Sequence, residues 1–210
     1  MSCNVMTAMS RLKLYLILSI LPLSTFSYAK VYDWVVLGDS ISSGYGVDSH
    51  DNWVNKADRA TPCSTETINL SVQGATSTDG LTTIKDFYRT NKSKFLIIEL
   101  GGNDALRGSS LTTLAENINS IINIAQKNES TVILIGVDLP PNYGKLFRNK
   151  FQNLFEDIAT TRHLMYKILD FPNNPKFLQP DGIHPNASGH QAIYDALAPM
   201  LLKLLCPKQC

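Results

Sequence analysis

The sequence predicts a single-domain α/β protein, a three-layer α/β/α arrangement with a central parallel sheet. Short apolar runs alternate along the chain with segments in which apolar residues recur every three or four positions. Strands that alternate with helices pair in parallel, and their sheet is covered by helices on both faces. The 210 residues are 44% hydrophobic and 18% charged, which suits one folded domain and excludes a disordered chain.

Five short apolar runs predict the strands, because they are rich in branched and aromatic residues. The expected strands cover residues 31–37, 67–70, 95–100, 131–137 and 164–169. Helical spacing fills the gaps between them. It predicts helices over residues 53–60, 111–125, 147–158 and 187–205, the last with Asn186 as its N-cap.

The first residues have the layout of a secretory signal peptide. Basic residues precede an apolar run over residues 14–23, and small residues lead to Ala29. The run is shorter than the roughly 20 residues that cross a hydrocarbon core. We therefore expect a signal peptide over residues 1–29, a mature domain over residues 30–210, and a periplasmic or secreted product. An uncleaved membrane anchor is the alternative.

Three cysteines lie in the expected mature domain, Cys63, Cys206 and Cys210. An exported chain meets an oxidising compartment, in which one disulfide can form. The alternatives are a bridge from Cys63 to Cys206, a bridge from Cys63 to Cys210, or free thiols. No second cysteine pair completes a zinc-binding pattern, so no metal is expected.

Polar motifs follow three of the expected strands, where parallel sheets carry their binding sites. Ser40 follows the first strand in a Gly-Asp-Ser turn and can project from the sheet edge. Gly74 follows the second strand, where the missing Cβ lets a backbone N–H approach a ligand. Asn103 follows the third strand in a Gly-Gly-Asn-Asp turn and offers a neutral amide donor. Each motif alone also fits an ordinary turn.

Asp181 and His184 lie just before the last expected helix. A carboxylate three residues before a histidine can turn back and accept a hydrogen bond from the imidazole, which fixes its tautomer. His184 would then present its other nitrogen to the Ser40 hydroxyl, a weak nucleophile until a base takes its proton. Donors at Gly74 and Asn103 would stabilise an oxyanion. Together the motifs predict acyl transfer at Ser40.

These four blocks resemble those of the GDSL, or SGNH, hydrolase family, which is named for a serine, a glycine, an asparagine and a histidine. They correspond to Ser40, Gly74, Asn103 and His184, and Ile41 stands where the family usually has leucine. The resemblance covers nearly all of the mature chain. It implies a flavodoxin-like three-layer fold and no metal or organic cofactor.

The resemblance also implies the roles of single residues. Ser40, His184 and Asp181 would form a catalytic triad. The N–H groups of Ser40 and Gly74 would form an oxyanion hole with the Asn103 side chain. Within the family the chain is most similar to small periplasmic bacterial thioesterases and lysophospholipases, which are also arylesterases. The matching segments are residues 100–108, 139–144 and 181–186.

The loops over residues 105–110 and 139–146 are expected to line an acyl-binding crevice, because both follow strands at the site edge. The expected substrate contacts are Asp39, Ala105, Leu106, Pro141 and Tyr143. Asp39 is also expected to make a structural hydrogen bond beside the nucleophile.

Other conspicuous side chains have simpler interpretations. His190 lies six residues beyond His184, a poor helical spacing for a joint metal site. The remaining expectations are surface positions for His50 and His163, core positions for Tyr45, Trp53 and the aromatic stripe over residues 147–155, and a loop-bracing role for Asp104.

The sequence therefore predicts a secreted serine esterase that cleaves acyl esters, thioesters or lysophospholipids. A carbohydrate O-acetyl esterase is the alternative, because the same catalytic groups serve both reactions and the pocket walls select the substrate. A non-catalytic exported binding module is a third hypothesis, which the complete set of polar residues disfavours. The formal net charge of +1 gives no reason to expect a nucleic-acid partner. We expect a monomer that contacts membrane lipid only transiently.

Overall fold

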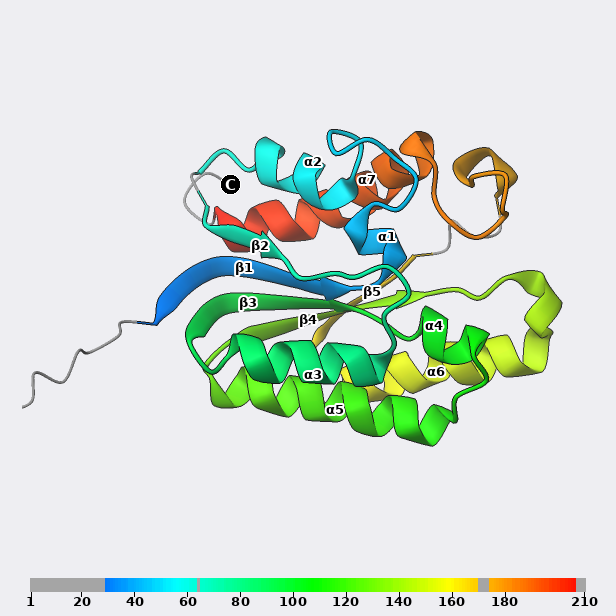
Figure 1. The fold of residues 1–210 in the computed structure, drawn as a ribbon, viewed down its shortest axis with the longest axis horizontal. Helices are drawn as coiled ribbons and strands as arrows, with labels where there is room; N and C mark the ends of the chain where they lie inside the picture. Colours follow the sequence, from blue (N-terminus) through cyan, green and yellow to red (C-terminus); the bar gives the residue numbers. More distant parts are fainter. Residues whose placement is uncertain (1–28, 64, 170–173, 207–210) are drawn as a thin grey trace, which may run out of the picture.

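The computed structural model describes residues 29–63, 65–169 and 174–206, and it has the three-layer α/β/α fold that the sequence predicts (Figure 1). Five parallel strands form one sheet in the order β2-β1-β3-β4-β5. Their bounds are β1 Lys30–Gly38, β2 Thr67–Asn69, β3 Asn91–Glu99, β4 Thr131–Val137 and β5 Met165–Leu169. Apart from Ala29, the predicted signal peptide lies outside the described residues.

Helices cover both faces of the sheet (Figure 1). On one face α2 (Trp53–Ala60) packs against α7 (Ala187–Leu205). On the other face lie α3 (Ser77–Phe87), α5 (Leu111–Lys127) and α6 (Lys145–Thr161). The connecting elements are the short helices α1 (Ser40–Ser43) and α4 (Gly102–Leu106) and the 3-10 turns η1 (Pro141–Tyr143) and η3 (Pro175–Phe177). None of these described helices is long and apolar enough to cross a bilayer.

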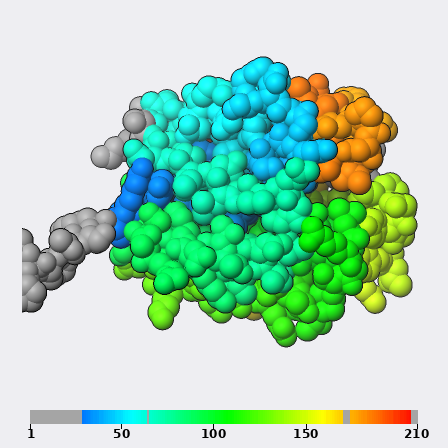
Figure 2. All heavy atoms as spheres, in the orientation of Figure 1, coloured from blue at the N-terminus to red at the C-terminus, as the bar shows by residue number. Residues whose placement is uncertain are grey.

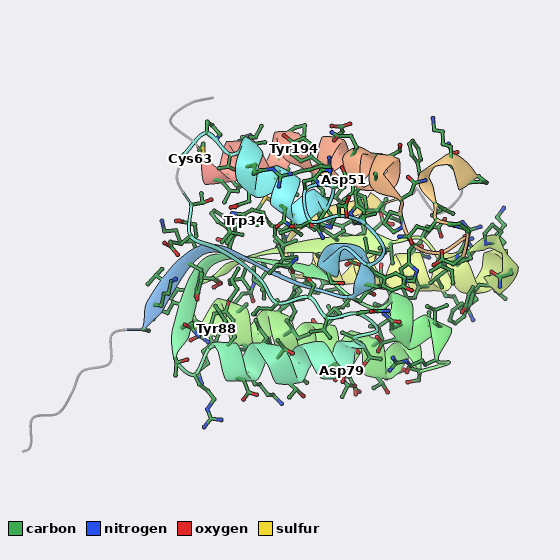
Figure 3. All side chains as sticks on the ribbon, turned by 45° about the horizontal axis from the view of Figure 1, so that its top comes forward. Trp34, Asp51, Cys63, Asp79, Tyr88 and Tyr194 are labelled. Carbon is green, nitrogen blue, oxygen red and sulfur yellow. A yellow bond between two sulfur atoms is a disulfide. The ribbon has the colours of Figure 1, made fainter. Side chains whose placement is uncertain are left out.

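The core lies between the sheet and its helices, as continuous apolar strands require. Residues 34–37 of β1 are fully buried, and Trp34 lies between the sheet and the α2–α7 layer (Figure 3). In α6 the buried rings of Phe151 and Phe155 pack edge to face, with centroids 5.1 Å apart. These rings and the buried Trp53 confirm the core positions predicted for Trp53 and for this part of the aromatic stripe, whereas Phe147 is only half-buried.

The helices do not cover the amino-terminal ends of the central strands. Lys30 and Val31 are exposed, and the first residues of β1 form the blue edge of the molecule in Figure 2. In β3, Asn91 pairs in register with Lys30 at the same edge. Polar residues are tolerated there, so β3 begins earlier than its apolar run predicts.

α3 is a helix that the sequence analysis missed. Its sequence contains three threonines and a glycine, which are weak helix formers. A capping box starts it, because the Thr76 side chain accepts from the Asp79 N–H and the Asp79 carboxylate accepts from the Thr76 N–H at 2.9 Å. Burial of Ile84 and Phe87 outweighs the low helix propensity. The Thr-x-x-Asp pattern was the signal that could have predicted its start.

α7 begins as predicted, with the Asn186 side chain accepting a hydrogen bond from the Gly189 N–H at 3.0 Å. His190 in its first turn is fully buried, and its Nδ1 accepts from the Trp53 N–H at 3.3 Å. Burial lowers the pKa of His190 to about 4, so the ring is neutral at neutral pH. His190 therefore links α7 to the start of α2.

One disulfide joins Cys63 to Cys206, whose Cα atoms are 6.2 Å apart. It connects the loop before β2 to the end of α7, on the side of the sheet where the strands begin (Figure 3). This pairing is one of the alternatives that the sequence left open, and Cys210 lies outside the described residues. Closing a loop across 143 positions restricts the unfolded chain.

We predict that replacing both bridged cysteines by serine lowers the free energy of unfolding by about 2–4 kcal/mol, because the unfolded chain regains its freedom. Urea unfolding followed by near-ultraviolet circular dichroism measures the change. Cys210→Ser is the matched control and should leave the transition in place. An unchanged transition in the double variant would contradict the stabilising role of the bridge.

Candidate active site

Ser40 is the first residue of α1 and directly follows β1 and Asp39. Asp39 caps this short helix, because its Oδ1 accepts a hydrogen bond from the Ile41 N–H at 3.1 Å. Strand, cap and helix together hold Ser40 at the carboxyl edge of the sheet, where it is 7% exposed and lines a cavity.

His184 and Asp181 meet Ser40 at this edge. The Nε2 atom of His184 lies 2.9 Å from Ser40 Oγ, and its Nδ1 lies 2.7 Å from Asp181 Oδ2. An ionised carboxylate can only accept, so this network assigns the ring proton to Nδ1 and leaves Nε2 to accept from the serine hydroxyl. The structure thus brings the three residues into one hydrogen-bond chain.

Asp181 is fixed by further donors. Its Oδ1 accepts from the N–H groups of Ile183 and His184 at 2.9 and 3.0 Å. Partial burial alone would raise the pKa of Asp181, but the hydrogen bonds from the His184 ring and from these N–H groups outweigh it and lower the pKa below its ordinary value. The carboxylate therefore stays charged beside the imidazole at neutral pH.

Gln179 joins the loop that carries His184 to the loop after α1 by hydrogen bonds. The Gln179 Nε2 donates to the carbonyl oxygens of Tyr45 and Pro185 at 2.7 and 2.9 Å, and its N–H donates to the His184 carbonyl at 2.8 Å. The Tyr45 ring lies against the imidazole, with centroids 4.5 Å apart. Sequence reasoning missed Gln179, because nothing local marks a contact across 134 positions.

The prediction that Tyr45 belongs to the core is wrong. Its side chain is exposed, and its ring contacts His184 at a tilt of 55° rather than packing into the apolar interior. The periodic neighbours that buried aromatic residues have in helices and strands are missing here, because Tyr45 lies in the loop after α1.

Gly74 and Asn103 both line the cavity beside Ser40. Gly74 has a φ of 74°, a left-handed conformation that favours glycine. Its carbonyl accepts from Arg107 Nη2 at 2.8 Å. The Asn103 Nδ2 donates to Asp39 Oδ2 at 3.0 Å, and an amide group has a second N–H to offer.

Asp39 and Asp104 hold neighbouring groups of the site in place through hydrogen bonds. Both oxygens of Asp39 are engaged, with Ile41 and Asn103, which agrees with a structural hydrogen-bonding role. Burial raises the pKa of Asp39 to about 6, against the lowering effect of these two donors. Asp104 accepts from the N–H and the hydroxyl of Ser77 at 2.7 and 2.6 Å, and so fixes the start of α3.

The cavity beside Ser40 has a volume of about 190 Å³. Its apolar lining consists of Ile41, Leu106, Val137, Leu139, Pro140 and Ile183. Of the five predicted substrate contacts, Asp39 and Leu106 line this cavity.

The other three predicted contacts, Ala105, Pro141 and Tyr143, are not among the residues that line the cavity. Ala105 is turned into the core by the helical conformation of α4. The Tyr143 ring stacks on Phe147 in α6, and Pro141 is exposed in η1. Instead, the residues after β4 that line the cavity are Asp138, Leu139 and Pro140, at the start of the predicted loop.

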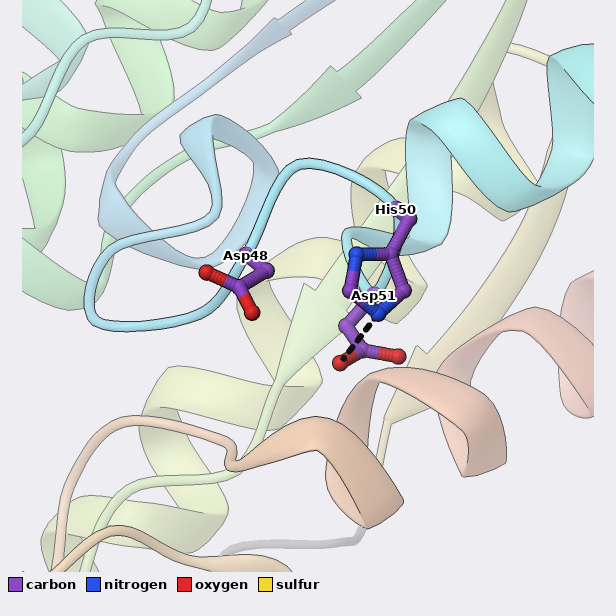
Figure 4. A group of neighbouring side chains, drawn as sticks. All are labelled: Asp48, His50 and Asp51. Carbon is purple, nitrogen blue, oxygen red and sulfur yellow. Dashed lines mark ion pairs between the residues drawn. The ribbon is translucent and has the colours of Figure 1, made fainter.

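Asp48, His50 and Asp51 form a separate group in the loop before α2 (Figure 4). Lys56 Nζ lies 3.1 Å from Asp51 Oδ1, and His50 Nε2 lies 3.4 Å from Asp51 Oδ2. A cation from the protein itself thus already neutralises Asp51. His50 is exposed as predicted, and so is His163.

The family model of GDSL-like lipases and acylhydrolases matches residues 36–192. The chain is 28% identical over 188 residues to thioesterase 1/protease 1/lysophospholipase L1 of Escherichia coli (strain K12), which covers 88% of this chain and 90% of that protein. It is 31% identical over 179 residues to esterase TesA of Pseudomonas aeruginosa, which covers 81% of this chain and 88% of that protein.

Solved structures agree with the sequence comparison. A crystal structure of TesA superposes with a TM-score of 0.74 at 29% identity, over 82% of this chain and 99% of that one. The psychrotrophic esterase EstA from Pseudoalteromonas sp., in a structure inhibited by monoethylphosphonate, gives a TM-score of 0.75 at 26% identity, over 82% and 98%. Since sequence and structure lead to the same relatives over most of its length, the chain belongs to the GDSL-like lipase/acylhydrolase family and is a serine hydrolase that acts on ester bonds.

Proposed function

We propose that the protein hydrolyses carboxylic esters and thioesters of acyl chains, lysophospholipids among them, through an acyl-enzyme intermediate on Ser40. The observation that carries this proposal is the hydrogen-bond chain from Asp181 through His184 to Ser40, beside a cavity with a largely apolar lining. The Escherichia coli relative is named as a thioesterase and lysophospholipase, which supports both substrate classes.

Acylation begins when His184 Nε2 takes the Ser40 hydroxyl proton. The Ser40 Oγ then forms a bond to the carbonyl carbon of the ester, and the carbonyl π electrons move to the oxygen. Asp181 stabilises the imidazolium that results. When the tetrahedral intermediate collapses, the bond to the alcohol or thiol breaks, and His184 gives that leaving group the proton.

The oxyanion of the intermediate is held by the N–H groups of Ser40 and Gly74 and by the second N–H of Asn103. Each such donor, fixed before the reaction, is worth roughly 10²–10³ in rate. Asp39 holds the Asn103 amide through one N–H, so the other is oriented without loss of freedom during the reaction.

Deacylation repeats these steps with water as the nucleophile. His184 takes a proton from the water, whose oxygen attacks the acyl carbon of the ester on Ser40. The second tetrahedral intermediate uses the same donors. Its collapse breaks the bond to Ser40 Oγ, which receives the proton from His184, and the carboxylic acid leaves.

The cavity favours an acyl chain over an acetyl group. Its volume of about 190 Å³ leaves room for more than the single methyl group of an acetyl ester. Six of its lining residues are apolar, and each CH₂ that they remove from water contributes about 0.8 kcal/mol. This argues for an acyl esterase over the alternative of a carbohydrate O-acetyl esterase.

An exported monomer is the form in which we propose that the protein acts. The Cys63–Cys206 disulfide supports an oxidising compartment, and hence the signal peptide expected from the sequence. A single chain supplies all the residues of the hydrogen-bond chain and of the cavity. The exposed side chains of Leu106 and Ile183 can contact lipid while substrate enters.

We predict that Ser40→Ala lowers kcat for a p-nitrophenyl ester by at least about 10⁴-fold, because the attacking atom is lost. His184→Ala should have a similar effect, and Asp181→Asn a smaller one, because the base remains and only its orientation suffers. Steady-state kinetics of purified variants measures the order. Asp51→Asn, in the exposed loop before α2, is the control. Full activity of Ser40→Ala would overturn the nucleophile assignment.

We predict that, across p-nitrophenyl esters from acetate to palmitate, kcat/KM is highest for medium chains, because these fill the apolar cavity. The same series run with Ser40→Ala corrects for background hydrolysis. Activity confined to acetate would support the O-acetyl esterase alternative, and acetylated xylan would then be the substrate to compare.

A further inference from the structure

Glu99 is a buried acid that the mechanism above does not use. It is the last residue of β3, it is fully buried, and it pairs in register with Gly38 of β1. It is the one charged residue in the apolar run over residues 95–100. A carboxyl group removed from water in this way is costly unless its surroundings compensate for it.

The donors that compensate Glu99 come from the turn that carries Ser40. The Ser42 hydroxyl donates to Glu99 Oε2 at 2.7 Å. The nearby backbone N–H groups of Asp39 and Ser42 lower the pKa of this carboxyl group and so favour its charged form. Ser42 follows Ser40 by two residues in the same helical turn, so its hydrogen bond to Glu99 fixes the segment on which the nucleophile stands.

The contact between Glu99 and Ser42 occupies the space that a side chain at position 38 would fill, so Gly38 is required there. A Cβ atom at Gly38 would lie 2.9 Å from Glu99 Oε2 and 2.7 Å from Ser42 Cβ. Any other residue would push the carboxyl group away from the turn. The glycine that precedes Asp39 and Ser40 is thus explained by the neighbouring strand.

Asp39 and Glu99 form a pair of buried acids. Burial raises the pKa of Glu99 well above its ordinary value, and the charge on Asp39 raises it further, against the lowering effect of the Ser42 hydroxyl and of the nearby backbone N–H groups. Asp39 has donors from Ile41 and Asn103 that favour its charged form. Two adjacent buried carboxyl groups do not both ionise, so Glu99 is the neutral member. Its Oε1 has no hydrogen-bond partner among the described residues, which costs less for a neutral carboxyl group than for a charged one.

We propose that Glu99 is a positioning residue for the nucleophile: its neutral carboxyl ties the Ser40 turn to the end of β3 and leaves the charge on Asp39, which holds Asn103. The inference rests on the proposed roles of Ser40 and Asn103. It assigns Glu99 no contact with substrate, because the residue acts through the turn and through Asp39.

The test compares two substitutions of Glu99 in the purified protein. Glu99→Leu removes every acceptor at similar size, and we expect kcat for a p-nitrophenyl ester to fall about 10²-fold with KM within about threefold, as for a displaced nucleophile. Glu99→Gln keeps a neutral acceptor for Ser42 and should retain kcat within about threefold. A merely structural role would lower stability in both without this difference in kcat.

Ser93→Ala is the matched control, since Ser93 is a buried polar residue in the same strand that hydrogen-bonds to Ser130 and Tyr88 at 2.8 Å. It should lower the melting temperature and leave kcat unchanged. If Glu99→Leu does not fold, Ser42→Ala decides, with a roughly tenfold lower kcat expected from one lost hydrogen bond.

The inference is overturned if Glu99→Leu keeps kcat within threefold of wild type, if Glu99→Gln is as impaired as Glu99→Leu, or if Ser42→Ala has wild-type kcat. In each of these cases Ser40→Ala still separates the two claims. Its inactivity would leave the proposed function intact, whereas its full activity would remove the basis of both.

Discussion

The hydrogen bond between Ser40 and His184 is the contact on which the proposed chemistry depends, and it joins residues 144 positions apart. The parallel sheet fixes one partner, because β1 ends directly before the Ser40 turn. The other partner, His184, lies in the loop before α7. Gln179 joins this loop to the loop after α1 by hydrogen bonds. Neither partner depends on a long flexible side chain, so the 2.9 Å distance is set by the fold itself.

The site contains acids in two kinds of surroundings. Asp181 lies at the partly exposed rim, where hydrogen bonds keep its pKa low and its charge beside the imidazole. Asp39 and Glu99 lie beneath the nucleophile, where burial raises the pKa of both. In the proposed mechanism the first environment stabilises the imidazolium of His184, and in the proposed role of Glu99 the second holds backbone and amide groups in place with a single charge. The same residue types thus serve different tasks because the fold exposes them differently.

Motifs after strands were readable from the sequence, because the ends of parallel strands must meet at one edge. The five strands and four of the helices followed from apolar periodicity, whereas α3 did not, since its threonines hide a helix that burial stabilises. The roles of Tyr45 and Gln179 depend on contacts between distant segments, which leave no local pattern. Glu99 did leave a signal, an acid inside an apolar strand, but its partner could be known only from the register of β1 and β3.

Identification of the residue that reacts with a fluorophosphonate tests the central claim most directly. The probe forms a covalent bond only with an activated nucleophile, and mass spectrometry of the digested protein locates the adduct. The account predicts one adduct per chain, on Ser40, and its loss in the folded His184→Ala variant. An adduct on another residue, or none in folded wild-type protein, would contradict the claim that His184 activates Ser40.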